Sequence, residues 1–206
     1  MKRLTALLLL LGLLLTGCGQ ATPTAPETTV PVPSTQAPQP STEATTQATE
    51  EPTLPPRDPT CDLTYQVEGT EESEPATLFL GEGYSLYIPN EGYEMAYDFS
   101  DDHTTVTWTA VNNERVQLII THYVGWTADQ VRLTTLALYS RYHWEEDEAG
   151  NLMGTHPQQQ HHWEMTLLDS GEGILAVSVC YPTEAAEGYG ARLKTIAGTL
   201  ELDPAS

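Results

Sequence analysis

Hydrophobic and polar residues alternate most clearly in the segment 104–123. Within each half of it, apolar residues recur at every second position, at Val106, Trp108, Ala110, Val116, Leu118 and Ile120. Such alternation predicts two half-buried β-strands. Between them lie Asn112 and Asn113, which tolerate the positive φ of a type I′ turn. We therefore predict a β-hairpin with a type I′ turn over this segment.

Shorter segments with the same alternation predict further strands, at residues 63–67, 76–80, 84–88, 93–99, 163–167 and 175–181. Two other segments repeat apolar residues at helical spacing, 127–139 and 183–200. The first begins with Thr127-Ala-Asp-Gln130, which has the form of a capping box. Residues 145–160 are acidic and then rich in glycine and glutamine, which predicts a loop.

The order of these elements favours one domain over residues 61–206. Strands joined by short turns pair antiparallel, and amphipathic helices can cover the faces of a sheet. The predicted fold class is therefore α+β, an antiparallel sheet flanked by helices.

The first eighteen residues have a different pattern. Two basic residues precede the apolar run 4–15, which ends in Leu-Thr-Gly-Cys18. A membrane-spanning helix needs about 20 apolar residues, so this shorter run predicts a signal peptide over residues 1–17. Its last four residues resemble the bacterial lipobox, and the resemblance implies that Cys18 is acylated. The alternative is an ordinary signal peptide that happens to contain a cysteine.

The segment 18–60 follows the signal peptide and is low in apolar residues. It consists mainly of Thr, Pro, Ala, Gln, Ser and Glu, a composition that cannot bury enough surface to fold. We predict a lipidated cysteine followed by a disordered, proline-extended linker. The mature protein is then expected on the extracytoplasmic face of the cell membrane, held there by its lipid anchor.

Two cysteines remain once Cys18 is assigned to the lipid. An even pair in an exported protein favours a disulfide, here between Cys61 and Cys180. The bridge would close a loop of roughly 120 residues and stabilise the fold by about 4–5 kcal/mol in the chain-entropy model. The alternative is two unpaired thiols, one of them buried.

The charge of the chain excludes one class of partner. It contains 8 lysines and arginines against 29 aspartates and glutamates, and loss of the signal peptide removes two of the basic residues. Nucleic-acid binding requires a basic face, which this composition cannot provide.

Three segments resemble domains of the PsbP family. They are Gly83-Tyr-Ser-Leu-Tyr-Ile-Pro89, the predicted helix after Gly125-Trp126-Thr127, and Cys180-Tyr-Pro182 leading into the residues 184–193. The likeness spans about residues 76–202 and implies an antiparallel sheet between helices. It implies no shared catalytic residues, because its members act as assembly, binding or accessory modules.

The histidines give one candidate for metal chemistry. His156, His161 and His162 lie close together in the sequence and near acidic residues, and imidazole with carboxylate can bind zinc. However, neighbouring residues of a strand point to opposite faces, and the spacing matches no compact zinc motif. Surface histidines are the simpler interpretation, and we expect no cofactor.

Catalytic and calcium-binding patterns are weaker. The turn containing Asp98, Asp101 and Asp102 lacks the glycine that a calcium loop requires. No Gly-x-Ser-x-Gly motif is present, and Ser170 reads as part of a turn.

Aromatic residues give a candidate ligand groove. Trp126, Tyr142 and Trp144 flank the first predicted helix and the following segment. Packing at the rim of the core is the alternative interpretation.

These patterns favour a non-catalytic binding or accessory module that contacts an envelope protein, a wall component or a small ligand. Two alternatives stay open: a metal-assisted hydrolase using the region from His156 to His162, and an envelope sensor that acts through a partner protein.

Overall fold

The computed structural model describes residues 56–203. The predicted signal peptide, the lipidation residue Cys18 and most of the predicted linker lie outside the described residues. Within residues 56–203, no helix is long and apolar enough to cross a membrane.

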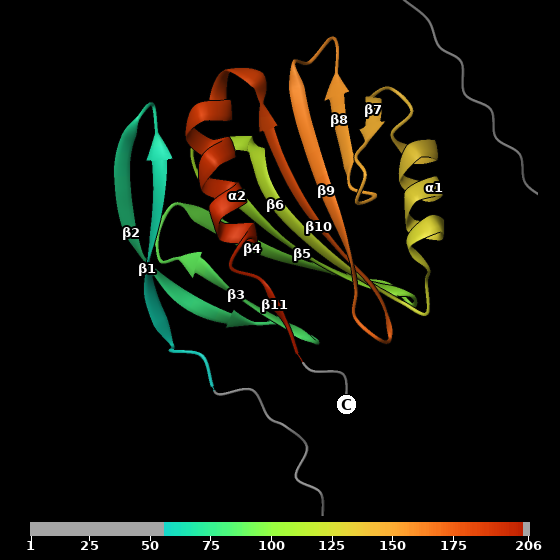
Figure 1. The fold of residues 1–206 in the computed structure, drawn as a ribbon, viewed down its shortest axis with the longest axis horizontal. Helices are drawn as coiled ribbons and strands as arrows, with labels where there is room; N and C mark the ends of the chain where they lie inside the picture. Colours follow the sequence, from blue (N-terminus) through green and yellow to red (C-terminus); the bar gives the residue numbers. More distant parts are fainter. Residues whose placement is uncertain (1–55, 204–206) are drawn as a thin grey trace, which may run out of the picture. The chain divides into compact units, whose positions relative to one another are not determined.

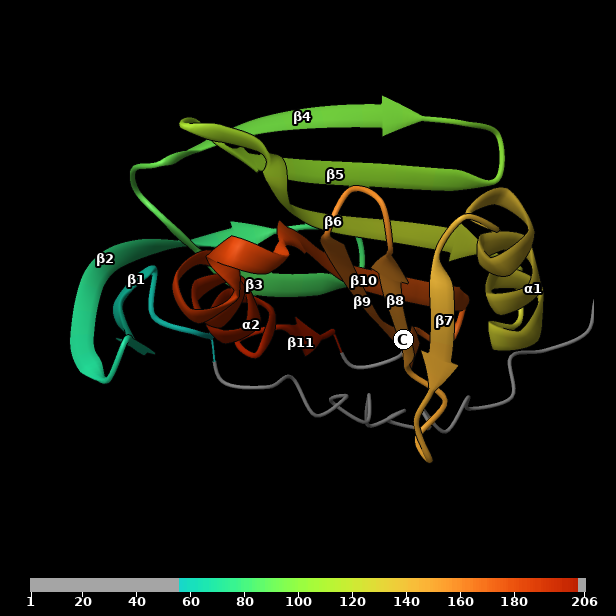
Figure 2. The same ribbon diagram turned by 90° about the horizontal axis from the view of Figure 1, so that it is seen from above.

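The strands form two sheets in which the paired strands are antiparallel (Figures 1 and 2). The four-stranded sheet contains, in spatial order, β1 (Thr60–Val67), β2 (Thr70–Leu80), β3 (Tyr84–Pro89) and β11 (Glu201–Leu202). The seven-stranded sheet contains, in spatial order, β4 (Tyr93–Phe99), β5 (His103–Ala110), β6 (Asn113–Val124), β10 (Gly173–Pro182), β9 (His161–Asp169), β8 (Leu152–His156) and β7 (His143–Glu146).

Two short α-helices complete the fold. The first, α1 (Ala128–Leu138), begins with the predicted capping box, in which the hydroxyl of Thr127 accepts from the backbone of Gln130. The predicted C-terminal helix is not continuous. A 3₁₀ turn (Thr183–Ala185) and a π-helical turn (Ala186–Gly190) lead into α2 (Ala191–Ala197).

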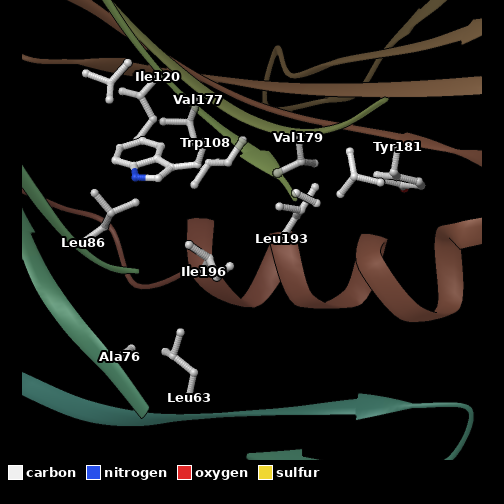
Figure 3. Packing of buried hydrophobic residues seen from close by; sticks show 14 of the residues in the cluster. Leu63, Ala76, Leu86, Trp108, Ile120, Val177, Val179, Tyr181, Leu193 and Ile196 are labelled. Atoms are coloured by element: carbon white, nitrogen blue, oxygen red, sulfur yellow. The ribbon is translucent and has the colours of Figure 1, made fainter. Parts of the chain in front are cut away.

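The predicted fold class is wrong, because the domain is mainly β and contains two antiparallel sheets rather than one sheet between helices. Instead, α2 lies between the two sheets (Figure 3). It buries Leu193 and Ile196 against Leu63 of the four-stranded sheet and Val179 of the seven-stranded sheet. The domain is thus a mainly β structure of two sheets. The four-stranded sheet, which contains the N-terminal strands, covers the other side of α2.

The seven-stranded sheet has two different faces. The inner face points toward α2 and the four-stranded sheet and carries Val106, Trp108, Val177 and Val179. The outer face carries a second hydrophobic cluster beneath α1, with Val131 of that helix packed against residues such as Ala176 and Cys180. This division into an inner and an outer face positions the candidate sites below.

The predicted hairpin forms, but its turn differs. Trp108 pairs with Leu118 across β5 and β6, as the alternation predicted. The register then shifts after Thr109, which is a β-bulge. Asn112 and Asn113 are not among the described residues with positive φ, so the predicted type I′ turn is wrong. The chain reverses at Val111 and Asn112, between the paired residues Ala110 and Asn113, and the bulge beside this turn increases the local twist.

The segment 145–160 is not the predicted loop. It contributes part of β7 and all of β8. Strand β7 lies at the edge of the sheet and is largely exposed, so acidic side chains there cost little. Gly154 of β8 is required because the indole of Trp144 lies directly against its α-carbon.

The folded part begins before the predicted boundary at residue 61. The guanidinium of Arg57 donates to the backbone oxygen of Ser85 at 3.1 Å and to that of Thr199 at 2.8 Å. The backbone N–H of Leu78 donates to the oxygen of Pro59 at 2.9 Å. Residues 57–60 are therefore held by the domain rather than belonging to the linker.

The predicted disulfide between Cys61 and Cys180 is not formed, and both are free thiols. Cys61 packs against the cluster between the sheets, whereas Cys180 belongs to the cluster on the outer face. The seven-stranded sheet therefore separates the two sulfur atoms. Burial raises the pKa of Cys180 to about 12.

Candidate functional site

The three histidines considered for metal binding are divided between the two faces of the sheet. His162 lies on the inner face, where its ring stacks on Tyr181 with 5.5 Å between centroids. His156 and His161 both contact Tyr142 on the outer side. Within residues 56–203, no three His, Cys, Asp or Glu side chains are arranged to hold a metal ion.

His161 has both ring nitrogens occupied. Its Nε2 lies 3.0 Å from the backbone oxygen of Arg115, and its Nδ1 lies 3.0 Å from the hydroxyl of Tyr142. Because a carbonyl oxygen can only accept, Nε2 carries the hydrogen and Tyr142 donates to Nδ1. Burial lowers the pKa of His161, against the opposing effect of its hydrogen bond to Arg115. This neutral histidine is a packing element and not a free ligand.

The predicted aromatic groove does not assemble as a unit. Tyr142 and Trp144 lie together, 5.4 Å apart, and each is 5.8 Å from Trp163. Trp126 packs instead on Tyr123, at 5.2 Å. These side chains pack against the outer hydrophobic cluster, in agreement with the alternative interpretation that they form the rim of the core.

The turn between β4 and β5 contains a serine, a histidine and an aspartate in contact. Nδ1 of His103 lies 2.8 Å from Asp102, and Nε2 lies 3.3 Å from the hydroxyl of Ser100. His103 packs on Tyr123 on the outer face. The three residues are at an exposed hairpin tip, and none of the described cavities is lined by them. The arrangement therefore gives no evidence of a substrate site.

A different site, not predicted from the sequence, lies at one end of the inner face. A cavity of about 290 Å³ opens there between the β2–β3 turn and strands β4 to β6. We call it the aromatic cavity. It is lined by Phe79, Leu80, Gly81, Glu82, Tyr84, Tyr97, Phe99, Thr104, Val106 and His122. Because its lining is mostly apolar, it resembles the interior of the domain more than its surface.

Strand β4 extends apolar side chains beyond the cover of the four-stranded sheet. Phe99 is 68% exposed and Tyr97 is 48% exposed. Their rings are stacked within 3° of parallel, 5.8 Å between centroids. Leu80, on the opposite side of the cavity, is 73% exposed. Adjoining exposed apolar residues of this kind mark interaction sites more often than chance surface exposure does.

A polar group accompanies the apolar lining. His122 is buried, and its Nε2 lies 3.0 Å from the hydroxyl of Ser170. Its Nδ1 is buried and has no hydrogen-bond partner among the described residues. A serine–histidine pair needs a third group that orients the histidine for nucleophilic catalysis, and none is present on Nδ1. The pair can instead offer a hydrogen bond inside an apolar site.

The buried tyrosine of the cavity is held neutral. Burial raises the pKa of Tyr84, and the nearby acidic groups Tyr97 and Glu82 raise it further. Its hydroxyl thus stays protonated across the physiological range. The lining of the cavity contains no lysine or arginine, and Glu82 is its one carboxylate.

The inner face also carries polar residues near α2. Glu164 accepts a hydrogen bond from the hydroxyl of Tyr181 and forms an ion pair with Lys194 at 2.8 Å. The ammonium group of Lys194 and the hydroxyl of Tyr181 stabilise the negative charge of Glu164, so its carboxylate is not available as a general base. The groove that they border has a volume of about 410 Å³ and is lined by Leu168 and Val177 on its apolar side.

The aromatic cavity left only indirect signals in the sequence. Tyr97 and Phe99 lie at alternate positions of their segment, which indicates a strand. The same alternation arises whether such positions are buried or exposed in the folded domain. An informative signal was Leu80 directly before Gly81, where a large apolar residue ends a strand at a turn. That position is exposed in most antiparallel hairpins.

Comparison with known proteins assigns the chain to no family. The chain matches no protein-family model and no curated protein. One similar solved structure is the solution structure of cyanobacterial PsbP (CyanoP) from Synechocystis sp. PCC 6803. The two are 10% identical in sequence, with 62% of this chain and 92% of that chain covered and a TM-score of 0.39. This level of similarity transfers no residue roles.

Proposed function

We propose that the protein is a non-catalytic binding module, held at the outer side of a cell membrane by the acylated Cys18, that binds a partner through the aromatic cavity. The lipid anchor is supported by the sequence pattern of residues 1–18. The binding role is supported by the cavity and by the exposed Tyr97 and Phe99 beside it.

The size of the cavity favours a side chain of a larger partner as its occupant. Small-molecule sites have volumes of roughly 300–1,000 Å³ and enclose most of their ligand. The aromatic cavity, at about 290 Å³, is at the lower end of that range. Its mouth is bordered by Leu80 and Phe99, which stay largely exposed. A protein partner that inserts one apolar residue would cover these two side chains as well.

The single observation that carries the proposal is the exposure of Tyr97 and Phe99 next to a mostly apolar cavity. Burying apolar surface is worth about 25 cal/mol per Å². A partner that covers both rings would therefore gain several kcal/mol, roughly the scale of a specific hot spot.

Site-specific photocrosslinking in cells tests this function. The photoreactive residue p-benzoylphenylalanine would replace Phe99 in the full-length chain, and Ala96 in the control. Ala96 is on the same strand but pairs with Thr107, on the outer face. We expect a discrete adduct from position 99 only, and its loss when Thr104→Phe fills the cavity. Equal crosslinking from both positions, or an adduct unaffected by Thr104→Phe, would contradict the proposal.

The anchor is tested separately. Cys18→Ser should move the protein from the membrane fraction to the soluble fraction and abolish incorporation of radiolabelled fatty acid. Unchanged fractionation and labelling of this variant would show that Cys18 is not the anchor.

A further inference from the structure

Strand β4 is at one edge of the seven-stranded sheet and pairs only with β5 among the described strands. At the two ends of this pairing, Ser100 donates to the oxygen of His103 and Val111 donates to the oxygen of Gly92. Backbone groups alternate in direction along an antiparallel strand. Even-numbered residues of β4 therefore point their N–H and C=O toward β5. Odd-numbered residues point theirs to the free edge.

The odd-numbered residues are also the apolar ones. Met95, Tyr97 and Phe99 are 49%, 48% and 68% exposed, and all three lie on the inner face beside or near the aromatic cavity. The free backbone groups and the uncovered apolar side chains thus belong to the same three residues. A strand added at this edge would bond to their backbones and place its own side chains directly beside theirs.

The opposite side of β4 is acidic. Glu94 and Asp98 lie on the outer face, on either side of Ala96, and the turn that follows adds Asp101 and Asp102. Long apolar edge strands invite uncontrolled pairing, and charged residues on the strand limit it. The acidic residues of β4 therefore restrict which strand can be added.

A second copy of this chain does not meet that restriction. Antiparallel pairing of two β4 strands about Ala96 would place Glu94 opposite Asp98 of the other copy on both sides of the centre. Like charges directly opposite each other destabilise strand pairing, and the chain as a whole has a formal charge of −21. A self-pairing centred on Ala96 is therefore disfavoured, and the acidic outer side of β4 favours a different polypeptide, with positive charge at alternate positions.

We propose that β4 binds an extended segment of a partner protein, in which apolar residues alternate with lysine or arginine, by adding it as an eighth strand to the sheet. This inference rests on the proposed function and names the partner's chemistry. The apolar residues of the segment contact Met95, Tyr97 and Phe99, and one of them enters the aromatic cavity. Its basic residues contact Glu94 and Asp98.

A synthetic peptide of alternating valine and lysine is the probe, used with the full-length chain. A peptide of the same composition, with the lysines grouped at one end, controls for attraction by charge alone. We expect the alternating peptide to bind and to slow hydrogen exchange at the amides of Met95, Tyr97 and Phe99. The amides of Glu94, Ala96 and Asp98 already face β5 and should change little.

Two variants of one residue separate backbone pairing from side-chain contact. Met95→Ala removes the methionine side chain and keeps the backbone N–H. Met95→Pro also removes the methionine side chain, and its ring takes the place of the N–H. Proline is accepted on an edge strand where the N–H faces outward, and an unchanged thermal midpoint confirms that the fold is intact. Met95→Pro should bind the peptide about fivefold more weakly than Met95→Ala, the value of one backbone hydrogen bond.

The outcomes are decisive in either direction. Equal binding of both peptides, no binding of either, or binding without slowed exchange at the odd-numbered amides would overturn strand addition. Photocrosslinking from position 99 is independent of these results. An adduct there without strand addition would retain the proposed binding role and reject only this mode.

Discussion

The backbone of Gly173 passes so close to the carbonyl oxygen of Tyr123 that a β-carbon at residue 173 would overlap this oxygen. Gly173 begins β10 and pairs with Val124 at the end of β6. The two strands form the centre of the seven-stranded sheet, so glycine is required here for the approach of one backbone to another.

Gly173→Ala should therefore destabilise the fold. Overpacking of this kind costs about 1–3 kcal/mol, because neither backbone can move without disturbing the sheet. Gly188→Ala is the matched control, since a β-carbon there meets no atom within 4 Å and its φ is not positive. Urea unfolding of both variants gives the free energies. A loss no larger for Gly173→Ala than for Gly188→Ala would contradict the prediction.

The two free thiols should differ strongly in reactivity. Cys180 is buried, and burial raises its pKa to about 12, whereas Cys61 is only partly buried. Because the thiolate is the reactive species, iodoacetamide at about pH 8 should modify Cys61 first and Cys180 only after unfolding. Mass spectrometry of the non-reduced protein provides the measurement. Two thiols that stay unmodified in denaturant until a reductant is added would show a disulfide instead.

Protonation of His161 should weaken the fold. Its pKa in the folded protein is lowered from 6.5 by burial, so the unfolded chain takes up a proton at higher pH than the folded one. The contribution of His161 is complete above pH 6.5 and is lost as the pH falls through its lower folded-state pKa.

The measurement is the free energy of unfolding at about pH 7.5 and about pH 5.5, a window above the range in which ordinary carboxylates titrate. His161→Gln should reduce the difference between the two values, while His143→Gln, at an exposed position of β7, should leave it unchanged. An unaltered pH dependence in His161→Gln would show that this residue is not responsible.

The N-terminus of α1 provides a prediction about local structure. The hydroxyl of Thr127 accepts from the backbone of Gln130, and the side chain of Gln130 accepts from the backbone of Thr127 at 2.8 Å. Thr127→Ala should cost about 1 kcal/mol, and Thr127→Ser, which retains the hydroxyl, should recover most of it. Equal stability of the two variants would mean that the capping box contributes little.

Local pattern predicted strands such as β1 and β5 because buried and more exposed residues alternate along them. The pairing of Trp108 with Leu118 followed from alternation alone. The same rule placed His161 and His162 on opposite faces, as observed. Applied to Val179 and Tyr181 of the inner face, it also places Cys180 on the outer face, which argues against the disulfide that residue counting favoured.

The alternation of apolar and polar residues could not predict that the strands divide into two sheets. Strand β3 and strand β5 have similar alternation, and nothing within either specifies its partner. Helix α2 would bury Leu193 and Ile196 whether it packed beneath a single sheet or between two sheets. The two arrangements differ only in what covers the other side of the helix. For the same reason the pattern of residues 93–99 predicted a strand, but not that Tyr97 and Phe99 stay exposed on it.

The position of Arg57 has a mechanical consequence. Its guanidinium joins the entry of the chain to Ser85, Thr199 and Glu201, so the segments that lead into and out of the domain meet at one corner of the four-stranded sheet. Tension applied through the preceding segment would be borne by this corner. Strand β4 belongs to the other sheet, and so would keep its shape while this corner is under load.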